Sequence, residues 1–173
     1  MAARILTDHE IASRLRVLPP LVDGLTDMRV QLQPCGVDIT VRAISRFAST
    51  GAIDFDNSGR ILSLLEEIPW VNDEVTLSAG SYHVVYNEIV NLPADVMALA
   101  YPRSSLLRCG ATLYTAVWDP GYSGRAETLL MVHNAHGFRL GRNARIAQLV
   151  FTALESSVES VYRGRFAGEN LHQ

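Results

Sequence analysis

The sequence predicts an all-β fold, either a barrel or a jelly roll. Most of the 173-residue chain divides into short segments in which apolar and polar residues alternate, each bounded by Gly, Asn, Asp or Pro. Helical spacing of apolar residues is confined to short stretches, so the strand–helix alternation of a parallel α/β sheet is missing. No internal repeat, low-complexity tract or linker divides the sequence. The pattern therefore indicates one β domain over residues 1–155, followed by a tail over residues 156–173.

The first segments are expected to form a helix and then a pair of strands. The segment TDHEIASRL begins with Thr7 and places Glu10 three residues later, which is the spacing of a helical capping box. Ile11 and Leu15 follow at helical spacing, so a short N-terminal helix is expected. Residues 30–47 (VQLQPCGVDITVRAISRF) alternate around a Pro-Cys-Gly turn and predict two strands.

From residue 50 on, turns and short apolar segments follow one another. Residues 50–60 (TGAIDFDNSGR) are rich in turn-forming residues and predict a loop. Residues 61–68 (ILSLLEEI) fit either a short helix or a buried strand, because periodicity does not separate the two. Further strands are expected within residues 74–102, 111–118, 126–134, 137–141 and 145–154.

The composition excludes several classes of protein. The formal net charge of −3 argues against a general nucleic-acid-binding surface, which is normally basic. No apolar run reaches the roughly 18 residues that a membrane-spanning helix needs. Asp8, His9 and Glu10 interrupt the apolar stretch that a signal peptide would require. We therefore expect a cytoplasmic protein without membrane contact.

The spacing of the cysteines and histidines, and the absence of lysine, limit the kinds of binding site that are expected. Cys35 and Cys109 cannot form a disulfide framework and have no metal-ligand spacing, so we expect both to be small core residues. His83, His133 and His136 have no recurring spacing to cysteines or carboxylates, so no metal held by protein ligands is expected. All fifteen basic residues are Arg, which means that a side chain binding an anion would do so through a guanidinium group.

The window YPRSSLLRCGATLYTAVWDPGYSG, residues 101–124, collects polar groups in an otherwise apolar region. Each of these groups alone fits a solvated turn. Together, two adjacent hydroxyls and successive backbone N–H groups between two guanidinium groups would form a concavity suited to an anion. The residues that carry the pattern are Arg103, Ser104, Ser105, Arg108, Asp119 and Tyr122.

The order of these residues resembles two motifs of the dUTPase and dCTP deaminase superfamily. Its members carry Arg-Ser-Ser-x-x-Arg-x-Gly and then Asp-x-Gly-aromatic-x-Gly, matched here by residues 103–110 and 119–124. The spacing between the motifs is most similar to that of short archaeal-type dUTPases within the deaminase family. The resemblance implies a distorted jelly-roll β-barrel that assembles as a homotrimer. Further matches extend over nearly the whole chain: ILTDHEI, QPCGVDITV, LPADVMALAYPRSSL, GRNARIAQLVF and YRGRFAGE.

The resemblance also implies a substrate, a pyrimidine deoxynucleoside triphosphate such as dUTP or dCTP. Arg103, Ser104, Ser105 and Arg108 would then form the phosphate cradle, because guanidinium groups, hydroxyls and backbone N–H groups all donate to phosphate oxygens. Mg²⁺ would be bound through the phosphates, since no acidic cluster in the sequence looks like a dedicated cage for it.

The second motif implies catalytic and sugar-binding roles. Asp119 would act as general base, or would position the water that attacks the α-phosphorus; its structural alternative is a turn residue bonded to its own backbone. Tyr122 would lie under the sugar and leave no room for a 2′-hydroxyl, whereas its structural alternative is a ring packed on the barrel rim. Backbone groups of residues 111–119 would read the base.

Two departures from the superfamily pattern affect the choice of chemistry, and the first concerns deamination. In dCTP deaminases a glutamate on the next strand activates water, but the matching position here is Leu129, or Leu130 with a one-residue shift. Glu127 lies two residues before Leu129 and would enter the site through a β-bulge; otherwise it is a solvated strand residue. This departure weakens the deaminase hypothesis and leaves hydrolysis unaffected.

The second departure lies in the tail. Tails of the superfamily close over the nucleotide with a Tyr, a basic residue and a Gln, and Tyr162 and Arg165 match the first two. Glu169 stands where the Gln is expected, and an acid near phosphates is unfavourable. A lid with Arg165 on phosphate and a disordered or partner-packed terminus both stay open.

The first functional hypothesis is therefore hydrolysis of dUTP to dUMP and pyrophosphate. The alternative chemistry is dCTP deamination, alone or coupled to hydrolysis. The alternative class is a nucleotide-binding relative without turnover, against which the retained Asp119 argues. The resemblance implies that each site is shared between subunits of a homotrimer, and a short hairpin alone cannot enclose a nucleotide. The sequence leaves the preference between uracil and cytosine open.

Overall fold

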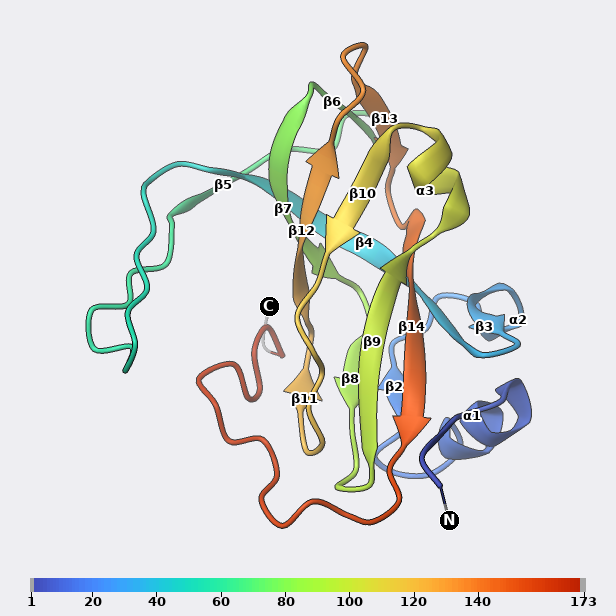
Figure 1. The fold of residues 1–173 in the computed structure, drawn as a ribbon. Helices are drawn as coiled ribbons and strands as arrows, with labels where there is room; N and C mark the ends of the chain where they lie inside the picture. The colour runs from blue at the N-terminus through green and yellow to red at the C-terminus, as the bar shows by residue number, and fades with distance from the viewer. Residues whose placement is uncertain (1, 172–173) are drawn as a thin grey trace.

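The computed structural model describes residues 2–171 and consists mainly of antiparallel strands (Figure 1). The helices of this region are short: α1 (Asp8–Arg14), α2 (Met28–Gln31) and α3 (Ser104–Arg108). Its strands are β1 (Arg4–Ile5), β2 (Val22–Asp23), β3 (Leu32–Gln33), β4 (Gly36–Phe47), β5 (Leu65–Glu67), β6 (Glu74–Leu77), β7 (Gly80–Tyr86), β8 (Ile89–Asn91), β9 (Val96–Pro102), β10 (Ala111–Tyr114), β11 (Ser123–Gly124), β12 (Glu127–Val132), β13 (Phe138–Gly141) and β14 (Arg145–Ala153). The prediction of an all-β fold with short helices is confirmed.

The largest sheet curls because β4 changes partners along its length. Residues 37–40 of β4 pair with β14, whereas residues 41–45 pair with β7. A register shift between Val41 and Ala43 marks a β-bulge at this point, and a bulge bends its strand. In hydrogen-bonding order the sheet runs β1-β14-β4-β7-β12-β10, with β9 on β14 and both β3 and β5 on β4. The bend lets this sheet wrap around the core as in a distorted jelly roll.

The core lies between the inward faces of these strands. Ile39 and Ile44 of β4 and Leu149 and Phe151 of β14 are at most 1% exposed. Along β7, β9 and β12 buried residues alternate with more exposed ones. The alternation that predicted these strands therefore arises because one face of each strand packs on the core.

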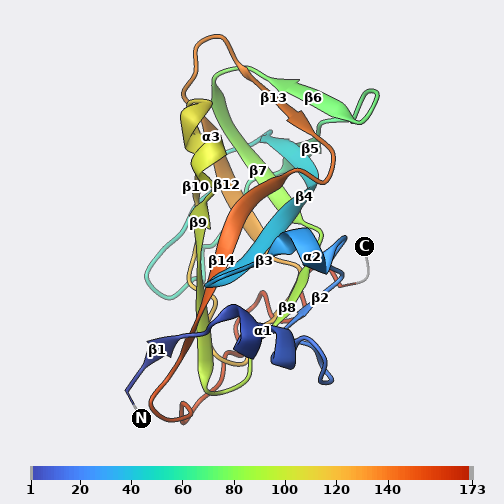
Figure 2. The same cartoon turned by 90° about the vertical axis from the view of Figure 1, so that its right-hand side faces the viewer.

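The N-terminal helix forms as predicted. The Thr7 backbone N–H donates to Glu10 Oε2 at 3.1 Å, and the capping box is complete. Ile11 is fully buried, which attaches α1 to the barrel. Helices α1 and α2 lie on the side of the barrel that also carries β2 and β3 (Figure 2).

The predicted pair of strands around the Pro-Cys-Gly turn forms as β3 and β4 but begins two residues later than expected, and the prediction for residues 61–68 was wrong. Asp27 caps α2 by accepting a hydrogen bond from the Arg29 backbone N–H, so residues 30 and 31 are helical and the strand begins at Leu32. Residues 61–68 are neither a helix nor a buried strand. Their central part forms β5, which is exposed and pairs with the end of β4 beyond the core. Tertiary pairing at an open strand end decides this segment.

The prediction that both cysteines lie in the core was also wrong. Cys35 lies in the turn between β3 and β4, and Cys109 follows α3; both are exposed. Turns run over the surface because their backbone polar groups need water or local partners. Their positions in turns, which the sequence already marked by Pro34, Gly36 and Gly110, outweigh the tendency of cysteine to be buried.

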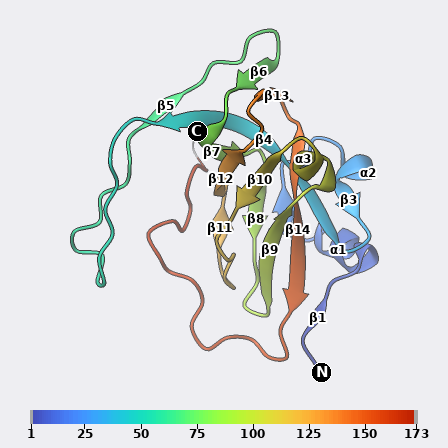
Figure 3. The ribbon, with the colours of Figure 1, turned by 45° about the horizontal axis from the view of Figure 1, so that its top comes forward.

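Two long segments leave the barrel. Residues 48–64 form the predicted loop, an arm that projects away from the body on the side opposite α1 (Figure 3). Residues 154–171 turn back along the barrel, where the Tyr162 N–H donates to the Pro120 carbonyl at 2.8 Å and the Gly168 N–H to the Ser123 carbonyl at 2.7 Å. Among residues 2–171, no helix is long and apolar enough to cross a membrane.

A buried carboxylate ties α2 to the bend in β4. Glu88 is 1% exposed and accepts hydrogen bonds from Gln31 Nε2 at 2.7 Å and from Thr40 through its backbone N–H at 2.8 Å and its hydroxyl at 2.7 Å. Burial raises the pKa of Glu88, and these bonds oppose that rise. Gln31 cannot reverse its amide, because its Oε1 accepts from the Asp27 N–H and its Nε2 also donates to the Asp38 carbonyl.

Replacing this carboxylate by an amide tests the network. In Glu88→Gln one of the two oxygen positions becomes an NH₂ group, which then faces either the Thr40 N–H or the Gln31 NH₂. We expect the free energy of unfolding in urea to fall by about 1–3 kcal/mol, because a buried donor is left without an acceptor. The exposed Glu66→Gln on β5 is the control and should change stability by less than about 0.5 kcal/mol. Equal unfolding midpoints for both variants would contradict the network.

Candidate active site

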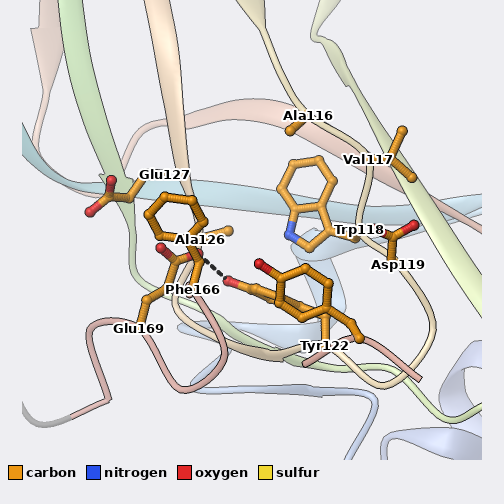
Figure 4. A pocket seen from close by; sticks show the side chains of 10 residues that line it. Ala116, Val117, Trp118, Asp119, Tyr122, Ala126, Glu127, Phe166 and Glu169 are labelled. Carbon is orange, nitrogen blue, oxygen red and sulfur yellow. Dashed lines mark hydrogen bonds between the residues drawn. The ribbon is translucent and has the colours of Figure 1, made fainter. Parts of the chain in front are cut away.

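The loop between β10 and β12 and the tail together form a pocket of about 220 Å³ (Figure 4). Trp118 anchors the loop because it pairs with Ala98 of β9 and its ring is buried. Gly121 closes the turn after Asp119 with φ of +85°, and a Cβ there would approach Val161 to 2.5 Å, so only glycine fits. The pocket is lined by Ala116, Val117, Trp118, Asp119, Tyr122, Ala126, Glu127, Tyr162, Phe166 and Glu169.

Tyr122 lies in the wall of this pocket and is held in place by the tail. Its ring is buried, and its hydroxyl donates to Glu169 Oε1 at 2.7 Å. The ring of Tyr162 lies 6.0 Å away, centroid to centroid. Burial raises the pKa of Tyr122, so its hydroxyl stays protonated and acts as a donor. The tyrosine therefore has a fixed orientation.

Two carboxylates lie at one end of the pocket, and their pKa values shift in opposite directions. His83 Nε2 donates to Glu127 Oε2 at 2.8 Å and Asn170 Nδ2 donates to Glu127 Oε1 at 2.9 Å. The bond from His83 is the main cause that lowers the pKa of Glu127, with a further contribution from Asn170. Burial raises the pKa of Glu169, against the lowering effect of the bond from Tyr122. One acid of the pair is thus held ionised, and the other is the one that takes up a proton first.

Asp119 lies at the opposite end. Figure 4 shows the rings of Trp118 and Tyr122 between Asp119 and the two glutamates. Asp119 is exposed and precedes the turn in which the Tyr122 N–H donates to its carbonyl at 3.1 Å. The pocket is therefore apolar in the middle, with acidic groups at both ends.

Glu127 enters the pocket without a bulge. It is the first residue of β12, and its pairing with Val85 of β7 continues in register through Leu129 opposite His83. The expected route through a β-bulge was wrong. Leu129, the position that matches the deaminase glutamate, lies on the same strand face and offers no group that moves a proton.

The four residues of the first motif do not line this pocket. Arg103 precedes α3, while Ser104, Ser105 and Arg108 lie on α3 and are exposed. Arg103 is five residues beyond Ala98 along β9, which corresponds to about 16 Å of strand from the Trp118 pairing. Figure 1 shows α3 at the far end of β9 from β11. Within one chain, the residues of the first motif and the pocket that contains the second motif therefore lie in two separate places.

The predicted tail residues differ in whether they line the pocket. Tyr162 and Glu169 line the pocket, whereas Arg165 is exposed and does not. Sequence reasoning missed Phe166 and Trp118 as wall residues, and it considered His83 only as a metal ligand, not as a partner of Glu127. The position of Trp118 directly before Asp119 was a usable signal. The sequence holds no such signal for the contact of His83 with Glu127, because this contact depends on the register of β7 with β12.

Within the part of the chain that the structure describes, no group of three or more His, Cys, Asp or Glu residues is arranged to hold a metal ion. Asp119 is exposed at its end of the pocket, and Glu127 is already engaged by His83 and Asn170.

Comparisons with known proteins agree with this fold. The chain belongs to the dCTP deaminase-like family, whose model matches residues 5–154. A relative from Methanococcoides burtonii, named probable deoxyuridine 5′-triphosphate nucleotidohydrolase, is 49% identical over 168 residues, which are 96% of this chain and 99% of that protein. A relative from Methanocaldococcus jannaschii, named deoxyuridine 5′-triphosphate nucleotidohydrolase, is 43% identical over 140 residues, 80% of this chain and 88% of that protein.

A solved structure gives the same result for the fold. The chain is similar to 2′-deoxycytidine 5′-triphosphate deaminase from Agrobacterium tumefaciens, with a TM-score of 0.70 and 21% sequence identity. The match covers 88% of this chain and 49% of that one, so this chain spans about half the length of the deaminase. At this identity the likeness establishes the fold alone, and the predicted distorted jelly roll is confirmed.

The opposite shifts of the two glutamates can be measured directly. In a carboxyl ¹³C NMR titration, Glu127 should titrate below the ordinary glutamate pKa of about 4.3 and Glu169 above it. In His83→Gln the pKa of Glu127 should rise, because the bond that stabilises its charged form is weakened. In Tyr122→Phe the pKa of Glu169 should rise further, because it loses a donor. A Glu127 that titrates above Glu169 would contradict this arrangement.

Proposed function

We propose that the protein hydrolyses dUTP to dUMP and pyrophosphate. The observation that carries this proposal is Asp119, exposed at one end of an aromatic pocket that Tyr122 and Trp118 wall. The two relatives above, which match 80% or more of this chain, bear the corresponding enzyme name. The proposal assigns this activity to the same pocket.

The pocket is suited to a nucleoside. Flat aromatic walls bind the base and the sugar by stacking and shape, and the orientation of Tyr122, fixed by Glu169, keeps the space beside a 2′-carbon narrow. With the sugar next to Tyr122, the α-phosphate lies towards Asp119. Glu169 is at the other end, so the acid that replaces the expected Gln stays away from the phosphates.

Asp119 would then serve the chemical step. Its carboxylate accepts a proton from a water while the oxygen of that water bonds to the α-phosphorus and the bond from this phosphorus to the bridging oxygen of pyrophosphate breaks. Phosphoryl transfer requires mainly positioning and charge neutralisation, so a single well-placed carboxylate suffices as the base. Mg²⁺ fits this site when it is carried on the phosphates beside the exposed Asp119, and when bound it neutralises phosphate charge.

The phosphates need cationic side chains, and none within residues 2–171 lines the pocket. Its volume of about 220 Å³ is below the roughly 300 Å³ at which ligand pockets begin, and Arg103, Ser104, Ser105 and Arg108 lie outside it. We therefore propose a homotrimer in which the cradle of one subunit completes the pocket of its neighbour. The tail, residues 156–173, is proposed as the wall that covers the nucleoside, and Arg165 as a phosphate contact from that tail. A cytoplasmic location stays a prediction.

A second candidate function is dCTP deamination, and Glu127 is the observation in its favour. Its carboxylate lines the pocket at the end away from Asp119, where the base would lie, and it contacts His83. Against this, the lowered pKa of Glu127 makes it a weak base, and Leu129 occupies the matching deaminase position. Hydrolysis therefore ranks first.

Substitution of the two acids separates the candidates. Asp119→Asn should lower pyrophosphate release from dUTP by about 10²–10⁴-fold, because an amide cannot accept the proton. Glu127→Gln is the matched control and should retain most of this activity. The assay incubates each protein with dUTP or dCTP and Mg²⁺, then separates nucleotides, pyrophosphate and ammonia.

Two results would decide against hydrolysis, and a third would decide against Asp119 as its base. Ammonia release from dCTP without pyrophosphate release from dUTP would assign deamination, and its loss in Glu127→Gln would identify the base. Nucleotide binding without either product would assign a binding protein. Wild-type turnover of dUTP by Asp119→Asn would remove Asp119 from the chemistry.

Mixing of inactive variants tests the shared site. Arg108→Ala removes an exposed side chain of the cradle, and Asp119→Asn removes the base. Each variant alone should be nearly inactive, but trimers refolded from a mixture contain sites with Asp119 from one chain and Arg108 from the other. We expect pyrophosphate release to recover to a substantial fraction of the wild-type rate.

Light scattering on the same samples provides the control for assembly. All proteins should have the mass of a trimer. A monomeric active protein, or a mixture no more active than its components, would contradict a site shared between subunits.

A further inference from the structure

Three charged side chains form a row across adjacent strands, outside the pocket. Asp38 is on β4, Arg145 begins β14, and Arg103 follows β9, and these strands are neighbours in the order β4-β14-β9. Arg103 Nε lies 2.9 Å from Asp38 Oδ2 in an ion pair, and Arg145 Nη1 donates to the same oxygen at 3.1 Å. The Asp38 side chain is 2% exposed, whereas the two arginines are about one-third exposed. One buried oxygen therefore orients two cationic groups at the surface.

The two arginines differ in how firmly the chain holds them and in which guanidinium N–H groups stay free for a ligand. Arg145 Nη1 also donates to the Val30 carbonyl at 2.5 Å, which fastens it to α2. Arg103 Nη1 makes a longer bond of 3.3 Å to the Arg145 carbonyl. Within residues 2–171 these contacts use Nε and Nη1 of Arg103, which leaves Nη2 for an external acceptor. Arg103 is thus held along one edge and open along the other.

The charge balance of the row favours an anion. Two guanidinium groups share one carboxylate, so the row carries one net positive charge, and Arg103 directly precedes the exposed residues Ser104 and Ser105 in the chain. A guanidinium group that is already oriented loses less side-chain entropy when it binds a phosphate oxygen. The net positive charge and the fixed orientation of Arg103 therefore both favour binding of a phosphate group.

We propose that Asp38 is a positioning residue for nucleotide binding: it holds Arg103 in the orientation that binds the triphosphate of the substrate. This inference rests on the proposed function, because it takes Arg103 as a phosphate ligand. Asp38 itself does not touch the nucleotide. Its effect is confined to the part of the ligand that Arg103 contacts.

The alternative is a structural cross-link among three strands with no bearing on the ligand. A cross-link would affect stability and all ligands alike. A positioning residue acts through Arg103 only, so its loss has no effect once Arg103 is gone. A double-mutant cycle distinguishes the two.

The experiment measures dissociation constants by calorimetry for α,β-imido-dUTP, which is not hydrolysed, and for dUMP, which lacks the outer phosphates. The proteins are wild type, Asp38→Asn, Arg103→Ala and the double variant. Asp38→Asn should weaken α,β-imido-dUTP about 10- to 100-fold and leave dUMP within about threefold. In the Arg103→Ala background, Asp38→Asn should have no further effect on α,β-imido-dUTP.

A charge-balanced variant controls for the possibility that Asp38→Asn weakens binding only because the protein is destabilised. Asp38→Asn leaves two cations without a counterion, so Asp38→Asn/Arg145→Gln is measured as well, with melting temperature as a check. It should still bind α,β-imido-dUTP more weakly than wild type by a similar factor. Recovery of both stability and affinity in this variant would overturn the proposal, as would equal weakening of both ligands or an additive cycle.

Failure of this inference and failure of the proposed function give different results. If the wild-type protein releases no pyrophosphate from dUTP, the hydrolase assignment fails while the binding cycle still decides the role of Asp38. If pyrophosphate is released and the cycle is additive, only the positioning role fails. Absence of α,β-imido-dUTP binding by the wild-type protein overturns both.

Discussion

The antiparallel pairing of β14 with β4 on one side and β9 on the other determines where both parts of the proposed site lie. At one end this pairing brings Asp38, Arg145 and Arg103 together. Further along β9, Ala98 pairs with Trp118 and anchors the pocket loop. Strands have a nearly constant rise per residue, so these two parts cannot approach each other within a chain. This separation is why we propose that a neighbouring subunit supplies the phosphate ligands that the pocket lacks.

The pocket uses its two glutamates differently although both lie at the same end. Glu127 receives hydrogen bonds from His83 and Asn170, and these bonds favour its charged form. Glu169 is placed by the Arg125 N–H bond to its carbonyl and orients Tyr122. The bond from Asn170 to Glu127 and the bond from the Arg125 N–H to Glu169 connect the tail to the barrel of the same chain. The tail thus forms part of the pocket wall through backbone and side-chain bonds made before any ligand binds, which limits the ordering that a ligand would have to induce.

Local signals predicted most of the strands and the first helix. The spacing of Thr7 and Glu10 suffices for a capping box because both partners lie within one turn. Residues 61–68 could not be assigned in this way, because β5 forms only by pairing with the end of β4, and the pattern of its own residues does not contain that partner. For Cys35 and Cys109 the local signal was present, because Pro34, Gly36 and Gly110 mark turns. The general tendency of cysteine to be buried nevertheless led to a wrong prediction.

By itself the sequence determined the fold class, the motif residues and the family resemblance, because these depend on residue types at short spacings along the chain. It also indicated that Asp119 and Tyr122 belong together, since a single turn joins them. Only the tertiary structure decided that Glu127 lines the pocket beside His83, that Glu169 lies away from Asp119, and that Asp38 holds Arg103. Each of these facts depends on strand register and on which strands are neighbours, and those follow from packing the whole core at once.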